Sequence, residues 1–178
     1  MEQLPRQKRR LPPLDQRRLR DLGLHYAGRY ATTKAKLSSY LTRKIRERGW
    51  TEGAEPPDLN ALIHDFARLG YVNDAAYAAA RARSFVRRGY GKGRLEQDLS
   101  AAGISDHEAN EARGVINDGT YASAHAFARR KHIGPYAAEM ASPELRQKHL
   151  AAFIRAGHSF DLARRFVAAA PGDEIEGP

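Results

Sequence analysis

Apolar residues recur three or four positions apart through most of the chain, which is the spacing of an amphipathic helix. Alanine, leucine and arginine are abundant, and runs of β-branched residues are missing, so no segment has the pattern of a strand. Two such apolar stripes consist of Leu37, Leu41 and Ile45, and of Leu59, Leu62, Ile63, Phe66 and Leu69. The pattern predicts an all-α protein whose apolar stripes face a core.

Glycines that follow apolar stripes divide the chain regularly. Gly49, Gly103 and Gly157 each stand where a helix is expected to end, and they are equally spaced, 54 residues apart. A Tyr-Ala pair precedes each glycine and is expected to open a helical stretch; these pairs begin at Tyr26, Tyr77 and Tyr121. A further short helix is expected after each glycine. The chain therefore contains three copies of one three-helix unit.

These copies predict three tandem three-helix-bundle repeats that stack into an elongated helical array, because a unit of roughly 50 residues buries little apolar surface alone. The third copy carries an insertion between two proline-marked turns. The predicted parts are a disordered basic leader (1–14), repeat 1 (15–72), repeat 2 (73–118), repeat 3 (119–170) with an inserted loop (134–142), and a disordered acidic tail (171–178).

The charge balance favours an acidic partner. Thirty Lys and Arg face 21 Asp and Glu, which gives a formal net charge of +9. More than half of this excess lies in the first 20 residues, so the folded part is only mildly basic. Cysteine is absent and no apolar stretch has the length of a signal peptide or membrane span, so a cytoplasmic protein is expected. We also expect a monomer, although the sequence leaves the oligomeric state open.

Three clusters of cations are the candidate contacts for that partner. On the predicted helix that carries Arg81 to Arg88, Ala78, Ala82, Phe85 and Val86 share the opposite, apolar face, so the guanidinium groups should reach outward. A solvated helix face is the plain alternative. Trp50 lies beside the cluster at residues 43–48. The residues at the equivalent positions of the other two repeats are expected to be buried, so we expect Trp50 to pack in the core and not to stack on a base. The clusters are Arg43, Lys44, Arg46 and Arg48; Arg81, Arg83, Arg87, Arg88, Lys92 and Arg94; and Arg129, Arg130 and Lys131.

No set of residues is arranged for catalysis. Gly89, Gly91 and Gly93 resemble a phosphate loop only loosely, because no strand precedes them and Lys92 is not followed by Ser or Thr. The seven histidines show no metal-ligand spacing, and no nucleophile motif accompanies them. We therefore expect a binding protein that is not an enzyme and that has no catalytic residue, cofactor or metal site.

Several segments together resemble the RecX family. They are Tyr40 to Trp50, Leu69 to Asp74, the pair Tyr77-Ala78, and Gly89 to Ile104. The resemblance is good over residues 21–117 and looser in the third unit. Two departures are Val72-Asn73-Asp74, where the family usually carries Leu-Asp-Asp, and the long loop of the third unit.

The resemblance to RecX implies three tandem three-helix units that lie in the groove of the RecA recombinase filament on DNA. It implies that the chain modulates, and mostly inhibits, the DNA-dependent ATPase, strand-exchange and coprotease activities of RecA, and so regulates homologous recombination, DNA repair and the SOS response. Single- or double-stranded DNA is a second implied partner. The alternative hypothesis is an independent helical DNA-binding module, in which one short helix enters a DNA groove.

Overall fold

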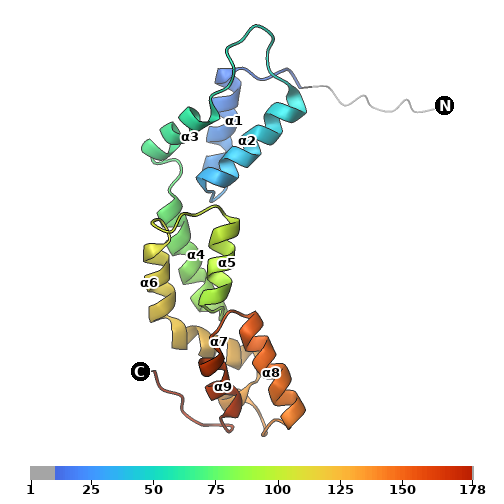
Figure 1. The fold of residues 1–178 in the computed structure, drawn as a ribbon, viewed down its shortest axis with the longest axis vertical. Helices are drawn as coiled ribbons and strands as arrows, with labels where there is room; N and C mark the ends of the chain where they lie inside the picture. The colour runs from blue at the N-terminus through green and yellow to red at the C-terminus, as the bar shows by residue number, and fades with distance from the viewer. Residues whose placement is uncertain (1–10, 178) are drawn as a thin grey trace, which may run out of the picture. The chain divides into compact units, whose positions relative to one another are not determined.

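The computed structural model describes residues 11–177, and all regular structure in this range is helical (Figure 1). The all-α prediction is confirmed for these residues. Their one extended pairing is an isolated parallel bridge between Leu14 and Trp50. No helix within 11–177 is long and apolar enough to cross a bilayer. The helices are α1 (Gln16–Arg29), α2 (Lys34–Arg48), α3 (Leu59–Arg68), α4 (Asp74–Arg88), α5 (Lys92–Ala101), α6 (Asn110–Asp118), α7 (Thr120–Lys131), α8 (Pro143–Arg155) and α9 (Phe160–Ala168), with a short 3-10 helix, η1 (Gly134–Tyr136).

The chain divides into two compact units, Met1–Asn73 and Asp74–Pro178. The first unit has one apolar core, built by α1, α2 and α3 around Phe66. The second unit has two cores: α4, α5 and α6 surround one that includes Phe85, and α7, α8 and α9 surround another that includes Phe153. Each core therefore takes most of its side chains from three consecutive helices.

The predicted stripes form the core of the first unit. Leu37 and Leu41 are fully buried, Ile63 and Phe66 are buried, and only Leu69, at the end of α3, is about half exposed. Gly23 of α1 lets the helices approach closely, because a Cβ atom there would come within 2.7 Å of the Phe66 ring. The 3.6-residue period thus identified which face of α2 and α3 is buried.

The leader prediction is wrong at its inner end. Leu14 is fully buried, and its backbone N–H donates to the Gly49 carbonyl oxygen at 2.9 Å. The Arg48 guanidinium donates to the Pro12 carbonyl oxygen at 2.7 and 3.0 Å. One apolar side chain and an extended backbone suffice to dock this segment. Leader residues 1–10 lie outside the described residues.

The equally spaced glycines end α2, α5 and α8, as predicted. Gly49, Gly103 and Gly157 all have positive φ angles, of 78°, 71° and 92°. The Tyr-Ala pairs are less regular. Tyr77 and Tyr121 lie in the first turns of α4 and α7, but Tyr26 lies in the last turn of α1, so the prediction that each pair opens a helix is wrong there. Glycine, whose φ requirement is physical, is the more reliable repeat marker.

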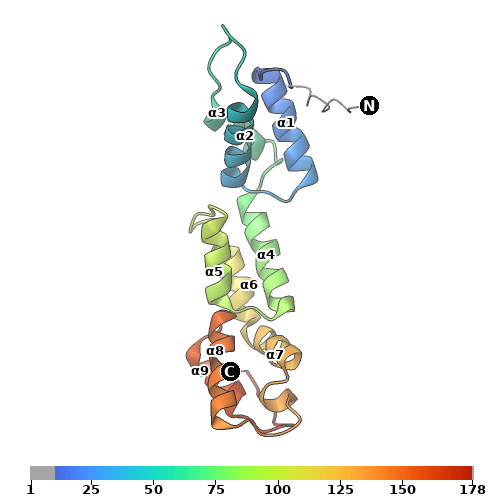
Figure 2. The ribbon, with the colours of Figure 1, turned by 90° about the vertical axis from the view of Figure 1, so that its right-hand side faces the viewer.

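Two glycine turns meet inside the second unit, where the N-terminal end of α5 approaches α8 and α9 (Figure 2). The Gly91 N–H donates to the Ala156 carbonyl oxygen, and the Gly93 N–H donates to the Gly157 carbonyl oxygen, both at 2.9 Å. A Cβ atom on Gly91 would lie 2.4 Å from the Gly157 carbonyl oxygen. We call residues 89–93 and 156–158 the glycine joint. Hydrogen bonds between backbone groups at this joint connect the α4–α6 group to the α7–α9 group.

His158 is the buried titratable group of the glycine joint. Its Nε2 atom lies 3.2 Å from the Gly89 carbonyl oxygen, and its ring packs against Phe127 and Phe153. The side chain is 6% exposed. Burial lowers the pKa of His158, the Gly89 carbonyl opposes that shift, and the positive charge of Arg130 adds to the lowering. We therefore expect neutral His158 in the folded protein near neutral pH.

This lowered pKa makes the second unit sensitive to acid. Below about pH 6.5, the ordinary value for histidine, the unfolded chain takes up a proton that folded His158 does not, so the free energy of unfolding falls as pH falls. Above that pH the stabilisation is fully present. Urea unfolding at pH 8 and pH 5 should show a larger loss for the wild type than for His158→Gln. Equal losses would contradict this role for His158.

The predicted disordered tail is also docked. The Gly172 N–H donates to the Pro135 carbonyl oxygen at 3.0 Å, and His125 Nε2 lies 2.9 Å from the Ile175 carbonyl oxygen. The Ile175 side chain packs against the α7–α9 core, and Arg165 donates to the Glu176 carbonyl oxygen at 3.0 Å. The prediction of disorder for residues 171–177 is therefore wrong. It rested on their acidic composition and overlooked a single apolar side chain, Ile175, that packs against the core. The hydrogen bond from Gly172 to Pro135 places this segment beside η1, and η1 itself lies in the long connection between α7 and α8.

Candidate anion-binding interface

The first cation cluster, on α2, is largely engaged within its own unit. Lys44 donates to Glu47 at 2.6 Å, and this hydrogen bond lowers the pKa of Glu47. Arg43 also lies 3.8 Å from Glu47, and Arg48 holds the Pro12 carbonyl. Arg46 is exposed. This cluster therefore offers a partner less charge than its sequence suggests.

Trp50 packs rather than offering a free ring. It is partly buried against the core of the first unit, and its indole N–H donates to the Glu55 carbonyl oxygen at 3.0 Å. The preference for core packing is confirmed. A base has no free indole N–H to bind at this position.

The second cluster is partly neutralised by acids that follow it in the sequence. Arg81 donates two hydrogen bonds to Asp98 of α5, at 2.8 and 2.6 Å, and this pairing raises the pKa of Arg81. Arg83 lies 3.8 Å from Glu111. The opposite face is buried as predicted at Ala78, Ala82 and Phe85, which are at most 4% exposed, and Val86 is partly buried against the same core. Arg81 is thus a structural link between α4 and α5, and its prediction as an outward contact is not supported by its geometry.

Reversing the charge of Arg81 should cost stability. Arg81→Glu places two carboxylates side by side at a site where both partners are only about one-third exposed, so we expect a loss of about 2 kcal/mol. Adding Asp98→Arg should restore much of this loss by recreating the pair with the charges exchanged. Urea unfolding of both variants measures it. If Arg81→Glu alone were as stable as the wild type, the Arg81–Asp98 pair would not contribute to the free energy of unfolding.

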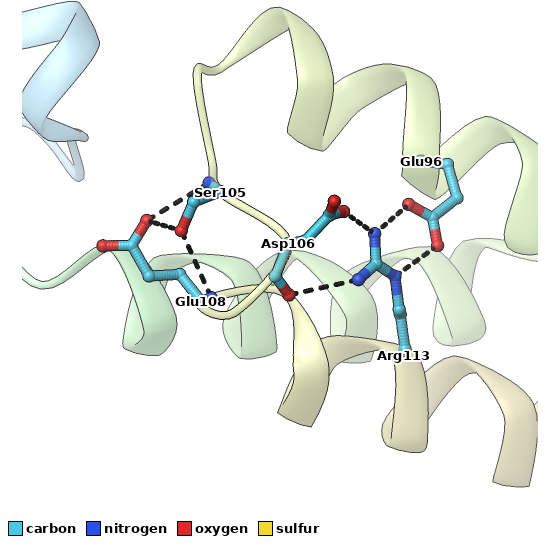
Figure 3. A network of polar contacts seen from close by, with 5 residues as sticks. All are labelled: Glu96, Ser105, Asp106, Glu108 and Arg113. Atoms are coloured by element: carbon cyan, nitrogen blue, oxygen red, sulfur yellow. Dashed lines mark hydrogen bonds and ion pairs between the residues drawn. The ribbon is translucent and has the colours of Figure 1, made fainter.

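Acidic residues that follow the second cluster in the sequence also form ion pairs within this unit (Figure 3). Arg113 of α6 donates to both carboxylate oxygens of Glu96, at 2.9 and 3.1 Å, and to Asp106 at 2.8 Å. These bonds raise the pKa of Arg113 further above its ordinary value. Beside this network, Ser105 and Glu108 pair in the turn that precedes α6: the Ser105 Oγ atom lies 2.6 Å from Glu108, and the Ser105 N–H also donates to the Glu108 carboxylate. The network stabilises the turn between α5 and α6. Its carboxylates, Glu96 and Asp106, are engaged with Arg113 and do not form a catalytic pair.

The structure gathers cations of the second and third clusters around one cavity, which we call the seam pocket. Its volume is about 440 Å³, and Arg94 of α5, Arg130 and Lys131 of α7, and Arg155 of α8 line it with the rings of Tyr90 and Phe127. No carboxylate within residues 11–177 lies within 4 Å of these four cationic groups. Arg155 is not among the candidate contacts predicted from the sequence, because those are runs of cations and Arg155 is the only cation between His149 and Ala156. Only the fold places it near Arg94.

Arginine side chains also surround Tyr90 at this pocket. The Arg88 guanidinium lies 5.1 Å from the Tyr90 ring centroid, and that of Arg130 lies 5.7 Å from it. Arg130 also donates to the Arg88 carbonyl oxygen, which fixes its position. Lys131 and Arg94 are exposed and have freer side chains.

The remaining predicted cations lie apart from the pocket lining. Arg129 lies over the Tyr136 ring, 5.0 Å from its centroid, and donates to its hydroxyl at 3.4 Å. Arg87 and Lys92 are exposed and do not line the cavity. The structure therefore brings together only part of the two predicted clusters.

The glycines of the joint are unsuited to binding phosphate through their backbone. The N–H groups of Gly91 and Gly93 already donate to the carbonyls of Ala156 and Gly157. The described residues, 11–177, also contain no group of three or more His, Asp or Glu side chains that could hold a metal ion. The chemistry this region offers is electrostatic attraction and hydrogen-bond donation by side chains.

Comparisons with known proteins agree on one family. A family model described as "RecX, second three-helix domain" matches residues 73–112. The chain is 31% identical over 180 residues to the Regulatory protein RecX of Myxococcus xanthus, covering 96% of this chain and 93% of that protein. It is 31% identical over 140 residues to the Regulatory protein RecX of Agrobacterium fabrum, covering 76% and 74%. The crystal structure of RecX from Lactobacillus salivarius shares the fold, with a TM-score of 0.59, 17% identity, and coverage of 85% of this chain and 93% of that one. The chain belongs to the RecX family of regulatory proteins.

Proposed function

We propose that this protein binds the RecA recombinase filament and restrains its DNA-dependent ATPase, strand-exchange and coprotease activities. The observation that carries this proposal is the 31% identity to a RecX regulatory protein across 96% of the chain. A regulator of this kind acts by binding, which requires exposed, fixed side chains rather than reactive ones. DNA repair and recombination in the cytoplasm are the processes it would regulate.

The exposed cations of the second unit are the proposed contacts. A filament of recombinase on DNA is long and anionic, and exposed arginines that are held in place lose little conformational entropy when they pair with carboxylate or phosphate. Arg88 and Arg130 are held by the Tyr90 ring, and Arg94, Lys131 and Arg155 surround the same cavity. The first cluster is a weaker candidate because three of its four members are engaged within the first unit.

The test is a titration of the protein into RecA with ATP and single-stranded DNA. We expect ATP turnover to fall in a saturable manner as the protein is added, and filament growth, followed by light scattering, to slow over the same concentration range. Unchanged ATP turnover and unchanged filament assembly at saturating protein would remove the proposal.

An independent DNA-binding module remains the alternative function. That hypothesis requires a helix that reads bases in a groove, and it predicts tight binding to particular duplex sequences in the absence of RecA. Competition between specific and random duplexes distinguishes the two, because a filament regulator needs no preferred sequence.

A further inference from the structure

The C-terminal tail turns back after α9 and runs along α7 in the direction opposite to that helix (Figure 1). Gly172 lies beside η1, which follows the end of α7, and the Ile175 carbonyl oxygen meets His125 in the middle of α7. Gly177 lies near the start of α7, where a Cβ atom on it would come within 3.6 Å of the Tyr121 ring. The tail therefore contacts the helix along much of its length.

Side chains of the helices hold the tail by its backbone. The Ile175 carbonyl oxygen lies 2.9 Å from His125 Nε2, and the carbonyl oxygen of the next residue, Glu176, accepts from Arg165 at 3.0 Å. A carbonyl oxygen can only accept, so His125 Nε2 carries a proton. Every peptide segment presents successive carbonyls, so these two donors recognise a peptide backbone and not the sequence of the tail.

Both donors are held in place by contacts that do not involve the tail. His125 Nδ1 lies 2.9 Å from the Tyr136 hydroxyl, and its ring packs edge-on against Phe166, with the ring centroids 4.8 Å apart. Arg165 donates to the Tyr121 hydroxyl, and its guanidinium lies 5.4 Å from the centroid of that ring. We call these five residues the tail site. Because their contacts with one another orient them, the site should keep its shape when the tail leaves.

The tail makes few contacts of its own. Ile175 is its one large apolar side chain, and it is only partly buried. Glu174 and Glu176 are exposed, and neither carboxylate forms an ion pair with a cation of residues 11–177. Asp173 accepts from the nearby Ala170 N–H at 2.6 Å. A segment with so few buried contacts opens locally at a small cost in free energy.

The chemistry of the site favours an acidic segment with one aliphatic side chain. Helix α7 contains no acid and has Arg129, Arg130 and Lys131 in its last turn, so the potential along it is positive. The α7–α9 core accepts one aliphatic side chain, as it accepts Ile175. A nucleic-acid strand has neither a peptide carbonyl nor an aliphatic side chain to offer. The fitting ligand is therefore a segment of protein.

We propose that the tail site binds an extended, acidic segment of a partner protein, which displaces the C-terminal tail of this chain. The tail is then an internal competitor, and it lowers the apparent affinity for the partner segment by occupying the site. The inference goes beyond the proposed function because the tail site lies outside the seam pocket, and its contact requires neither a filament nor a nucleic acid.

The test uses the full chain and a fluorescein-labelled peptide with the sequence of residues 169–177 as the probe, with binding followed by anisotropy. Ile175→Ser should release the tail, and this variant should bind the peptide about tenfold more tightly than the wild type does. Adding Arg165→Gln should abolish this gain. Adding Arg164→Gln instead, an exposed arginine of the same helix, should preserve it.

Competition experiments identify what the site recognises. A peptide with serine in place of isoleucine should not displace the probe, and neither should oligothymidylate or polyglutamate at equal charge concentration. Displacement by any of these would overturn the proposal, because the site would then recognise charge alone. Equal affinity of the wild type and Ile175→Ser for the probe would also overturn it.

Two further measurements complete the test. Sedimentation of the wild type should show a monomer, and a dimer that Ile175→Ser abolishes would identify a second copy of this chain as the occupant and overturn the proposal. If Ile175→Ser fails to fold, hydrogen exchange in the wild type decides. Excess peptide should remove the protection of the Gly172 amide, because its hydrogen bond to Pro135 breaks as the tail leaves. Unchanged protection at saturating peptide would contradict displacement.

Discussion

Gly91→Ala is expected to destabilise the second unit by about 3 kcal/mol. The added Cβ atom would lie 2.4 Å from the Gly157 carbonyl oxygen, which is backbone and has no rotamer with which to move away. Relief requires the joint to open, which stretches the 2.9 Å hydrogen bond between the Gly91 N–H and the Ala156 carbonyl oxygen. Gly91 has a φ of −87°, so backbone strain contributes nothing and the effect isolates the close approach. Urea unfolding measures it.

Gly114→Ala is the matched control. Gly114 lies inside α6, and no neighbouring atom comes within 4 Å of a Cβ atom built there. Alanine should therefore stabilise this helix by about 0.5–1 kcal/mol. If Gly91→Ala and Gly114→Ala shifted the unfolding midpoint in the same direction, backbone contact at the joint would not be what requires glycine.

Phe66→Ala should unfold the first unit and leave the second folded. The Phe66 side chain is fully buried at the centre of the α1–α3 core, and its removal leaves a cavity that should cost about 4 kcal/mol. A unit of this size has little stability to lose. The cores of the second unit contain no residue from the first. Loss of structure should therefore be confined to one unit.

Hydrogen exchange of backbone amides measures this directly. Amides of α1, α2 and α3 should lose protection in Phe66→Ala, and those of α8 should keep it. Leu69→Ala is the control, because this side chain at the end of α3 is 47% exposed and should change stability little. Uniform loss of protection along the whole chain would show that the three cores fold as one.

Much of the fold follows from local rules. The apolar period identified the buried faces of α2 and α3, and the φ requirement of glycine placed the ends of α2, α5 and α8. At the start of α8, Ser142 Oγ accepts from the Leu145 N–H at 3.3 Å and Pro143 is the first helical residue, a local pattern typical of a helix N-terminus. These features depend on residues within one or two helical turns, so the sequence alone carries them.

The interface depends on residues that are distant in sequence, and this is where prediction failed. Arg81 looked like an outward cation until Asp98, 17 positions later, paired with it. Arg155 looked isolated until α8 placed it beside Arg94. The sequence around Gly89 and Gly91 does not reveal their neighbours, although a Cβ atom on Gly91 would meet the Gly157 carbonyl oxygen and one on Gly89 would meet the Phe127 backbone. Charge runs reveal where cations are, and only tertiary contacts reveal which of them are free.

The ends of the chain show a similar limit. Residues 12–14 and 171–177 have the composition of disordered segments, and each is anchored by a single apolar side chain, Leu14 or Ile175. One buried side chain is too small a signal to stand out in a composition average, yet it is worth about 2 kcal/mol. Backbone hydrogen bonds to neighbouring loops add to it.

Co-sedimentation with RecA filaments assembled on single-stranded DNA tests the central claim most directly. We expect the wild-type protein and the Arg17→Gln/Lys148→Gln/Arg164→Gln control to pellet with the filaments and to saturate at a fixed ratio to RecA. The Arg94→Gln/Lys131→Gln/Arg155→Gln variant should pellet less at every concentration. If the wild-type protein stays in the supernatant at saturating filament, it is not a filament-binding regulator.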